Sequence, residues 1–101
     1  MSEIQNKAVA LAAQYEGDLA AQSSPQRSAL FLKSALDLYY ALGGDEEAGL
    51  ALASAHPVTP LRVDAAIANV LVEVAVASHL NDIDMIQATY NRLDAELERS
   101  A

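Results

Sequence analysis

The most informative stretch of the sequence is residues 25–44, which read PQRSALFLKSALDLYYALGG. Leucine, phenylalanine and tyrosine recur here at three- and four-residue spacing, which is typical of a helix with a broad apolar surface. Pro25 suits the first turn of a helix, and the two glycines at the end tolerate the left-handed conformation that terminates one. A single narrow stripe of polar residues interrupts the apolar surface: Lys33, Asp37 and Tyr40.

A second apolar helix is predicted from about Pro60 to Leu80. At about 100° per residue, two apolar faces emerge on it, one with Val63, Ile67, Val70, Leu71 and Val74, the other with Leu61, Val72 and Val76. Between them runs a polar stripe that contains Arg62, Asn69 and Glu73. A helix that is apolar on two sides lies at the centre of a bundle or against a partner subunit. Hiding both helices is difficult for one chain of this length, so at least a dimer is expected.

The remaining sequence predicts three more helices. The first is capped by Ser2 and continues past Gly17, the third begins at Asp45, and the fifth is capped by Asp82. The predicted caps of the two apolar helices are Ser24 for the second helix and Thr59 for the fourth. The fifth helix carries the cleanest apolar stripe: Ile83, Ile86, Tyr90, Leu93 and Leu97. We therefore predict an all-α fold, a single-domain bundle of about five helices over residues 1–101, dimeric through its second, fourth and fifth helices.

Composition narrows the classes of function. The chain has 101 residues, with 6 Lys and Arg against 14 Asp and Glu, which gives a formal net charge of −8. This charge opposes binding to nucleic acid and to anionic membranes, and favours a protein partner with a basic surface. There is no cysteine, and hence no disulfide or zinc-thiolate site. No signal-peptide pattern opens the sequence, so a cytoplasmic location is expected.

Residues 61–80 are long enough to cross a membrane, but they contain several polar side chains: Arg62, Asp64, Asn69, Glu73 and His79. An ionised group at the middle of a bilayer costs several kcal/mol, so no membrane span is expected.

The two polar stripes allow two interpretations. In one, they converge on a pocket between helices that binds a small anionic ligand through Lys33, Asp37, Tyr40, Arg62, Asn69 and Glu73. In the other, Lys33 and Asp37 form an exposed i,i+4 ion pair, and Asn69 and Glu73 lie on a solvated edge. Neither histidine has metal-ligand spacing to the other, and the sequence has neither a Gly-rich phosphate loop nor a serine-nucleophile turn.

Residues 29–97 resemble the all-α nucleoside triphosphate pyrophosphohydrolase (MazG-like) family. The resemblance lies in the stretch ALFLKSALDLYYAL at residues 29–42, and in the long apolar helix that leads into NDIDMIQATYNRL at residues 81–93. The family chelates magnesium with Glu-Glu-x-x-Glu on one helix and Glu-x-x-Asp on another, and it forms dimers. The resemblance thus implies a dimeric helical scaffold with the ligand site between those two helices.

Several carboxylates of the family pattern are replaced in this chain. Lys33, Ser34 and Ala66 stand where the family has glutamates, and Asn69 stands where it has aspartate. Asp37 remains as a metal ligand, with Glu73 one turn beyond Asn69. Lys33 would place a fixed cation where the family places a carboxylate, which suits an anionic ligand bound without metal.

These observations predict a non-catalytic, or catalytically degenerate, helical interaction protein that needs no cofactor. The alternative is a divergent magnesium-dependent nucleotide pyrophosphohydrolase, with Asp37 and Glu73 on the metal and with Lys33 and Arg62 on phosphates. A helical-repeat adaptor with a concave peptide groove is a third alternative, which the unequal helix lengths disfavour.

Overall fold

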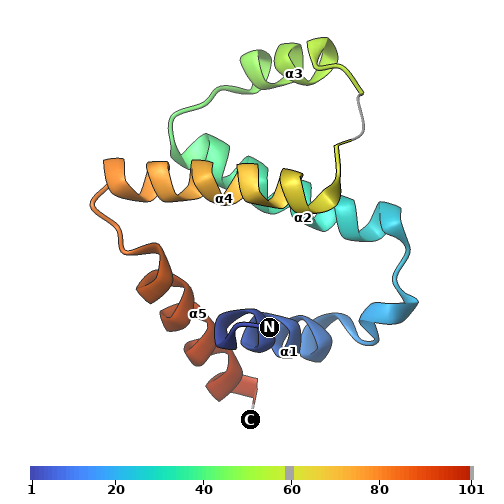
Figure 1. The fold of residues 1–101 in the computed structure, drawn as a ribbon, viewed down its shortest axis with the longest axis vertical. Coiled ribbons are helices and arrows are strands. Elements are labelled where there is room, and N and C mark those ends of the chain that lie inside the picture. The colour runs from blue at the N-terminus through green and yellow to red at the C-terminus, as the bar shows by residue number, and fades with distance from the viewer. Residues whose placement is uncertain (59–60, 101) are drawn as a thin grey trace. The chain divides into compact units, whose positions relative to one another are not determined.

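The structure is a computed structural model that describes residues 1–58 and 61–100, with the side chain of Ser100 excepted. Within this part of the chain every regular element is helical (Figure 1), which confirms the all-α prediction. The five α-helices are α1 (Glu3–Glu16), α2 (Ser24–Ala41), α3 (Glu46–Ala55), α4 (Val63–Leu80) and α5 (Met85–Ser100), and a short 3-10 helix, η1 (Leu19–Ala21), follows α1.

The chain divides into two compact units. One, the α1–α5 unit, consists of residues 1–22 and 70–101, and the other, the α2–α3 unit, consists of residues 23–69. The helix α4 belongs to both, because its first residues through Asn69 lie in the α2–α3 unit and the rest lie in the α1–α5 unit. Each unit is described below by itself.

Side-chain caps begin four of the α-helices, in three cases at the predicted residue or next to it. The Ser2 hydroxyl accepts from the backbone N–H of Gln5 at the start of α1, and the Asp45 carboxylate accepts from that of Ala48 at the start of α3. Ser23, and not Ser24, caps α2, since its hydroxyl accepts from the Gln26 N–H while the Gln26 side chain accepts from the Ser23 N–H. This reciprocal capping box makes the earlier serine the better cap.

Two other predicted boundaries are wrong. Gly17 ends α1, where its φ of 80° gives the left-handed turn that an L-residue adopts only with strain. Asp84, and not Asp82, caps α5: its carboxylate accepts from the N–H groups of Ile86 and Gln87, while Asp82 forms the preceding turn at φ 54°. The predicted Thr59 cap lies outside the described residues, and α4 begins later than predicted, at Val63.

The α1–α5 unit holds the buried side chains. Leu11 of α1 is 6% exposed and Leu93 of α5 is 3% exposed, and both helices contact each other. Leu93 belongs to the predicted stripe of α5, on which Tyr90 and Leu97 are half-buried and Ile86 is exposed. The later part of the stripe, from Tyr90 to Leu97, is therefore the face that α5 turns towards α1, while its first two residues, Ile83 and Ile86, are exposed.

The α2–α3 unit contains no buried residue over its described parts, 23–58 and 61–69. Large apolar side chains are exposed along α2 and α4, namely Phe31, Leu32, Leu36, Leu38, Tyr40, Val63, Ile67, Val70, Leu71, Val72, Val76 and Leu80. Apart from Tyr40 and Leu80, these are side chains that the sequence marks as facing a core or a partner subunit. Within the described chain they still face water.

The helix α4 also meets the length and composition of a membrane-spanning helix. Its 18 residues from Val63 to Leu80 are apolar enough to cross a bilayer. Arg62 precedes the helix, so the fully charged side chains within it are Asp64 and Glu73. The sequence-based expectation that α4 does not cross a membrane stays a prediction, for which a test is given below.

Candidate functional site

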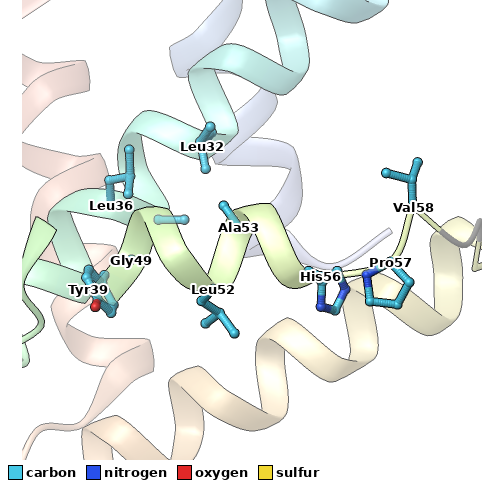
Figure 2. Close-up of a pocket in the computed structure, with 10 residues that line it drawn as sticks. Leu32, Leu36, Tyr39, Gly49, Leu52, Ala53, His56, Pro57 and Val58 are labelled. Carbon is cyan, nitrogen blue, oxygen red and sulfur yellow. The ribbon is translucent and has the colours of Figure 1, made fainter. Parts of the chain in front are cut away.

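An apolar groove of about 600 Å³ lies between α2 and α3 (Figure 2). Its walls come from one face of each helix and from the segment that follows α3: Leu32, Ala35, Leu36 and Tyr39 on α2, Gly49, Leu52 and Ala53 on α3, and then His56, Pro57 and Val58. Hydrocarbon side chains dominate this lining. The Tyr39 hydroxyl and the His56 imidazole are its polar side-chain groups. The groove therefore suits an apolar occupant of peptide or small-ligand size.

Tyr39 of α2 contacts both the start of α3 and the turn that precedes it. Its hydroxyl donates to the carbonyl oxygen of Asp45 at 3.0 Å, and its ring lies against Gly44 and Gly49. A Cβ on Gly44 would overlap the ring, and one on Gly49 would lie 3.2 Å from its Cε2 atom. Glycine at both positions is what allows α3 to fold back onto α2 at this distance.

Negative charge gathers at the start of α3, ahead of Gly49, the first residue of that helix to line the groove. Asp45 caps α3, and Glu46 and Glu47 occupy the first turn of the helix, where they complement the positive end of its dipole. All three residues are exposed. No ion pair engages Glu46 or Glu47 within residues 1–58 and 61–99. Their carboxylates are thus accessible to a cationic partner.

The predicted site residues of α2 lie beside this groove rather than in it. Lys33, Asp37 and Tyr40 are exposed, and none of them lines the cavity. Lys33 and Asp37 make no ion pair with each other in the described chain, although the i,i+4 spacing allows one. The ring of Tyr40 instead contacts that of Tyr39 edge to face, with centroids 5.5 Å apart.

The predicted site residues of the α4 region are Arg62, Asn69 and Glu73. The Arg62 guanidinium pairs with the Asp64 carboxylate at 3.0 Å, and Asn69 is exposed. Within the described part of the α2–α3 unit, no hydrogen bond or ion pair links Arg62 or Asn69 to the α2 stripe. Glu73 lies in the α1–α5 unit, so the two predicted metal ligands, Asp37 and Glu73, belong to different units. The shared pocket stays a prediction.

Among the described residues, no group of three or more His, Asp or Glu side chains lies close enough together to hold a metal ion.

A charged cluster between α1 and α5 went unpredicted. The Lys7 ammonium lies 2.8 Å from the Asp94 carboxylate, 3.9 Å from that of Glu3 and 5.2 Å from the centre of the Tyr90 ring. The hydrogen bond to Asp94 raises the pKa of Lys7, while desolvation and then the charge of Glu3 raise the pKa of Tyr90. A fourth contact, from the Tyr15 hydroxyl to the Glu96 carboxylate at 3.2 Å, lies along the same pair of helices.

These contacts join α1 to α5, so the cluster has the features of a stabilising contact between two helices, which we call the clasp, rather than of a reactive site. In the sequence, Lys7 and Asp94 each lie beside the apolar stripe of their helix, which is the one hint that they could meet. They are 87 residues apart, so no local pattern predicts that they form an ion pair.

Comparison with protein-family models, with curated proteins and with solved structures gives no match to this chain.

Proposed function

We propose that this chain is a non-catalytic helical interaction protein that assembles as a homodimer through the apolar faces of α2 and α4 and the exposed Ile86 of α5, with Ile83 just before that helix, on a scaffold like that of the MazG-like family. The observation that carries the proposal is the exposure of large apolar side chains along α2 and α4. Over the described residues, the buried hydrophobic side chains are those of Leu11 and Leu93. Moving one such side chain out of water contributes roughly 1.5–3 kcal/mol.

The spacing of these side chains supports pairing between helices. On α2, Phe31, Ala35, Leu38 and Leu42 follow one another at intervals of four, three and four residues. On α4, Val63, Ile67, Val70 and Val74 repeat the same intervals. This is the pattern of helices that pack side by side with interlocking side chains. Both seams are free of charged residues, so two copies with a net charge of −8 each can meet there without burying an ion.

The test of self-association is the molar mass of the purified chain by light scattering and sedimentation over a wide concentration range. A homodimer has twice the 10.7 kDa mass of one chain. A mass that stays at that of one chain up to the highest concentration would contradict the proposal.

The second candidate, a divergent magnesium-dependent nucleotide pyrophosphohydrolase, is supported by the family resemblance and by the accessible stripe of Lys33 and Asp37 on α2. A thermal-shift screen against nucleoside di- and triphosphates, with and without magnesium, separates the two. A ligand present at about 100 times its Kd stabilises a fold by roughly 2.7 kcal/mol. The interaction protein predicts no magnesium-dependent shift. A shift that needs magnesium, and that is lost when Asp37 and Glu73 are both replaced by alanine, would favour the enzyme, and release of pyrophosphate from the bound nucleotide would then test turnover.

A further inference from the structure

The groove between α2 and α3 has the dimensions of a docking site for a helix. Leu32, Leu36 and Tyr39 follow one another at i, i+4 and i+7 on α2, and thereby line about 10.5 Å of groove, at 1.5 Å per residue. Leu52 and Ala53 form the facing wall. Amphipathic helices bind such grooves with anchors at the same intervals. A small polar metabolite would find few hydrogen-bonding groups among these walls.

The charges of the α2–α3 unit indicate which kind of partner helix would bind the groove. Between Ser23 and Val58 the α2–α3 unit carries two cations, Arg27 and Lys33, against four carboxylates, Asp37, Asp45, Glu46 and Glu47. Three of the carboxylates stand together where α3 begins. A second copy of this chain, with its net charge of −8, would bring further negative charge to this end of the groove. A partner helix with lysines and arginines would instead complement these carboxylates.

We propose that the α2–α3 groove binds an amphipathic helix of a partner protein, with apolar anchors at i, i+4 and i+7 and with basic residues along its flanks. The inference rests on the proposed interaction function and adds to it a site and a class of partner. The groove uses Leu32, Leu36 and Tyr39, whereas the proposed dimer seam of α2 uses Phe31, Leu38 and Leu42. Ala35 belongs to both sets. At 100° per residue the centres of the two sets lie about 100° apart on α2, so the two surfaces meet at Ala35 and otherwise use different residues.

The test uses a synthetic peptide of about 14 residues, four helical turns, with leucines on one face, lysines on the other and a single tryptophan among the leucines. The chain contains no tryptophan, so the emission reports the peptide alone. We expect saturable binding with a blue shift of the emission, and binding that weakens as salt rises. Two control peptides are expected not to bind: one with glutamate in place of lysine, and one with the leucines and lysines reordered so that no apolar face forms.

Two leucines of α3 provide matched variants. Leu52 lines the groove and is 65% exposed, while Leu50 lies outside it and is 62% exposed. We expect Leu52→Gln to weaken peptide binding by about tenfold or more, and Leu50→Gln to change it by less than about twofold. Replacing both Glu46 and Glu47 with glutamine is expected to weaken binding and to flatten its salt dependence. Circular dichroism of each variant verifies that the helices are retained.

Several outcomes would overturn the inference: equal effects of the two leucine variants, equal binding of the glutamate peptide, or no binding of the lysine peptide. A fall in molar mass caused by Leu52→Gln would identify a second copy as the occupant, and would overturn it too. The mass of the unmodified chain, measured in the same samples, tests the homodimer separately. If the chain is a monomer and binds the peptide, the homodimer is refuted and the groove proposal stands. If the chain is a dimer and does not bind the peptide, the groove proposal is refuted and the homodimer stands.

Discussion

Tyr39 lies between two glycines whose roles in its packing differ. A methyl group at Gly44 overlaps the ring, so Gly44→Ala is expected to displace Tyr39 and to destabilise the fold by about 1–3 kcal/mol, the usual cost of overpacking. At Gly49, a position inside α3, alanine gains about 1 kcal/mol of helix propensity and meets the ring at 3.2 Å, so little net change is expected. Thermal denaturation compares the two variants, and equal losses of stability would contradict the packing described for Tyr39.

Lys7 gives a pH dependence of known sign. Its pKa is raised above the ordinary value of 10.5, chiefly by the hydrogen bond to Asp94, so the folded chain holds this proton more tightly than the unfolded chain does. The resulting stability is fully present below pH 10.5 and is lost as the pH rises through the folded pKa. We expect Lys7→Met to lower the Tm at neutral pH and to converge with the unmodified chain in strongly alkaline solution. Lys33→Met, which removes a lysine without an ion pair, serves as the control, and parallel curves for all three proteins would refute the role of Lys7.

At the scale of the helices, the seams of α2 and α4 lead to a prediction about assembly. Leu38→Glu places a charge on the α2 seam, and burying that charge against a second copy costs several kcal/mol. We expect the dimer Kd to rise by about a hundredfold or more, since each 1.4 kcal/mol is a factor of ten. Leu50→Glu makes the same exchange on α3, outside the proposed seams, and is expected to leave the Kd unchanged. Analytical ultracentrifugation measures the dimer Kd of both variants. A similar rise in Kd at the two positions would contradict the proposed α2 seam.

The helices were largely predictable from sequence because their signals are local. Apolar spacing, the caps at Ser2 and Asp45 and the two glycines after α2 all depend on neighbours a few residues away. Besides the end of α1 at Gly17 and the late start of α4, the errors lie where two residues compete for one cap: Ser23 with Ser24, and Asp84 with Asp82. In each pair the hydrogen bonds of the first turn decide which residue is the cap, and the residue type alone does not.

The candidate site was less predictable because it depends on how helices meet. The groove exists because Gly44 and Gly49 admit the Tyr39 ring, and the sequence marks Tyr39 only as apolar. The clasp between Lys7 and Asp94 joins residues 87 positions apart. The stripe residues Lys33 and Asp37 were identified from one helix alone, which cannot show what stands opposite them.

At the scale of the whole molecule, α4 allows a test of membrane insertion. Its 18 residues extend about 27 Å, close to the thickness of the hydrocarbon core, but Glu73 falls near its middle. An acidic side chain there costs roughly 2.5–3.5 kcal/mol. We expect the chain to stay in the aqueous phase when floated with vesicles of neutral or anionic lipid. Glu73→Leu is the matched variant that removes this penalty. Flotation of the unmodified chain with neutral vesicles would show that α4 enters the bilayer.

The small number of buried side chains has a consequence for how the protein responds to its own abundance. Leu11 and Leu93 are the buried hydrophobic residues of the described chain. If the protein pairs as proposed, much of its folding free energy is gained on meeting a second copy. Its Tm should therefore rise with protein concentration, as it does for any fold coupled to association. In a cell, newly made chains would remain open to proteases until enough of them accumulate to pair. The rate of synthesis would then set not only how much of the protein is present but also what fraction of it is folded.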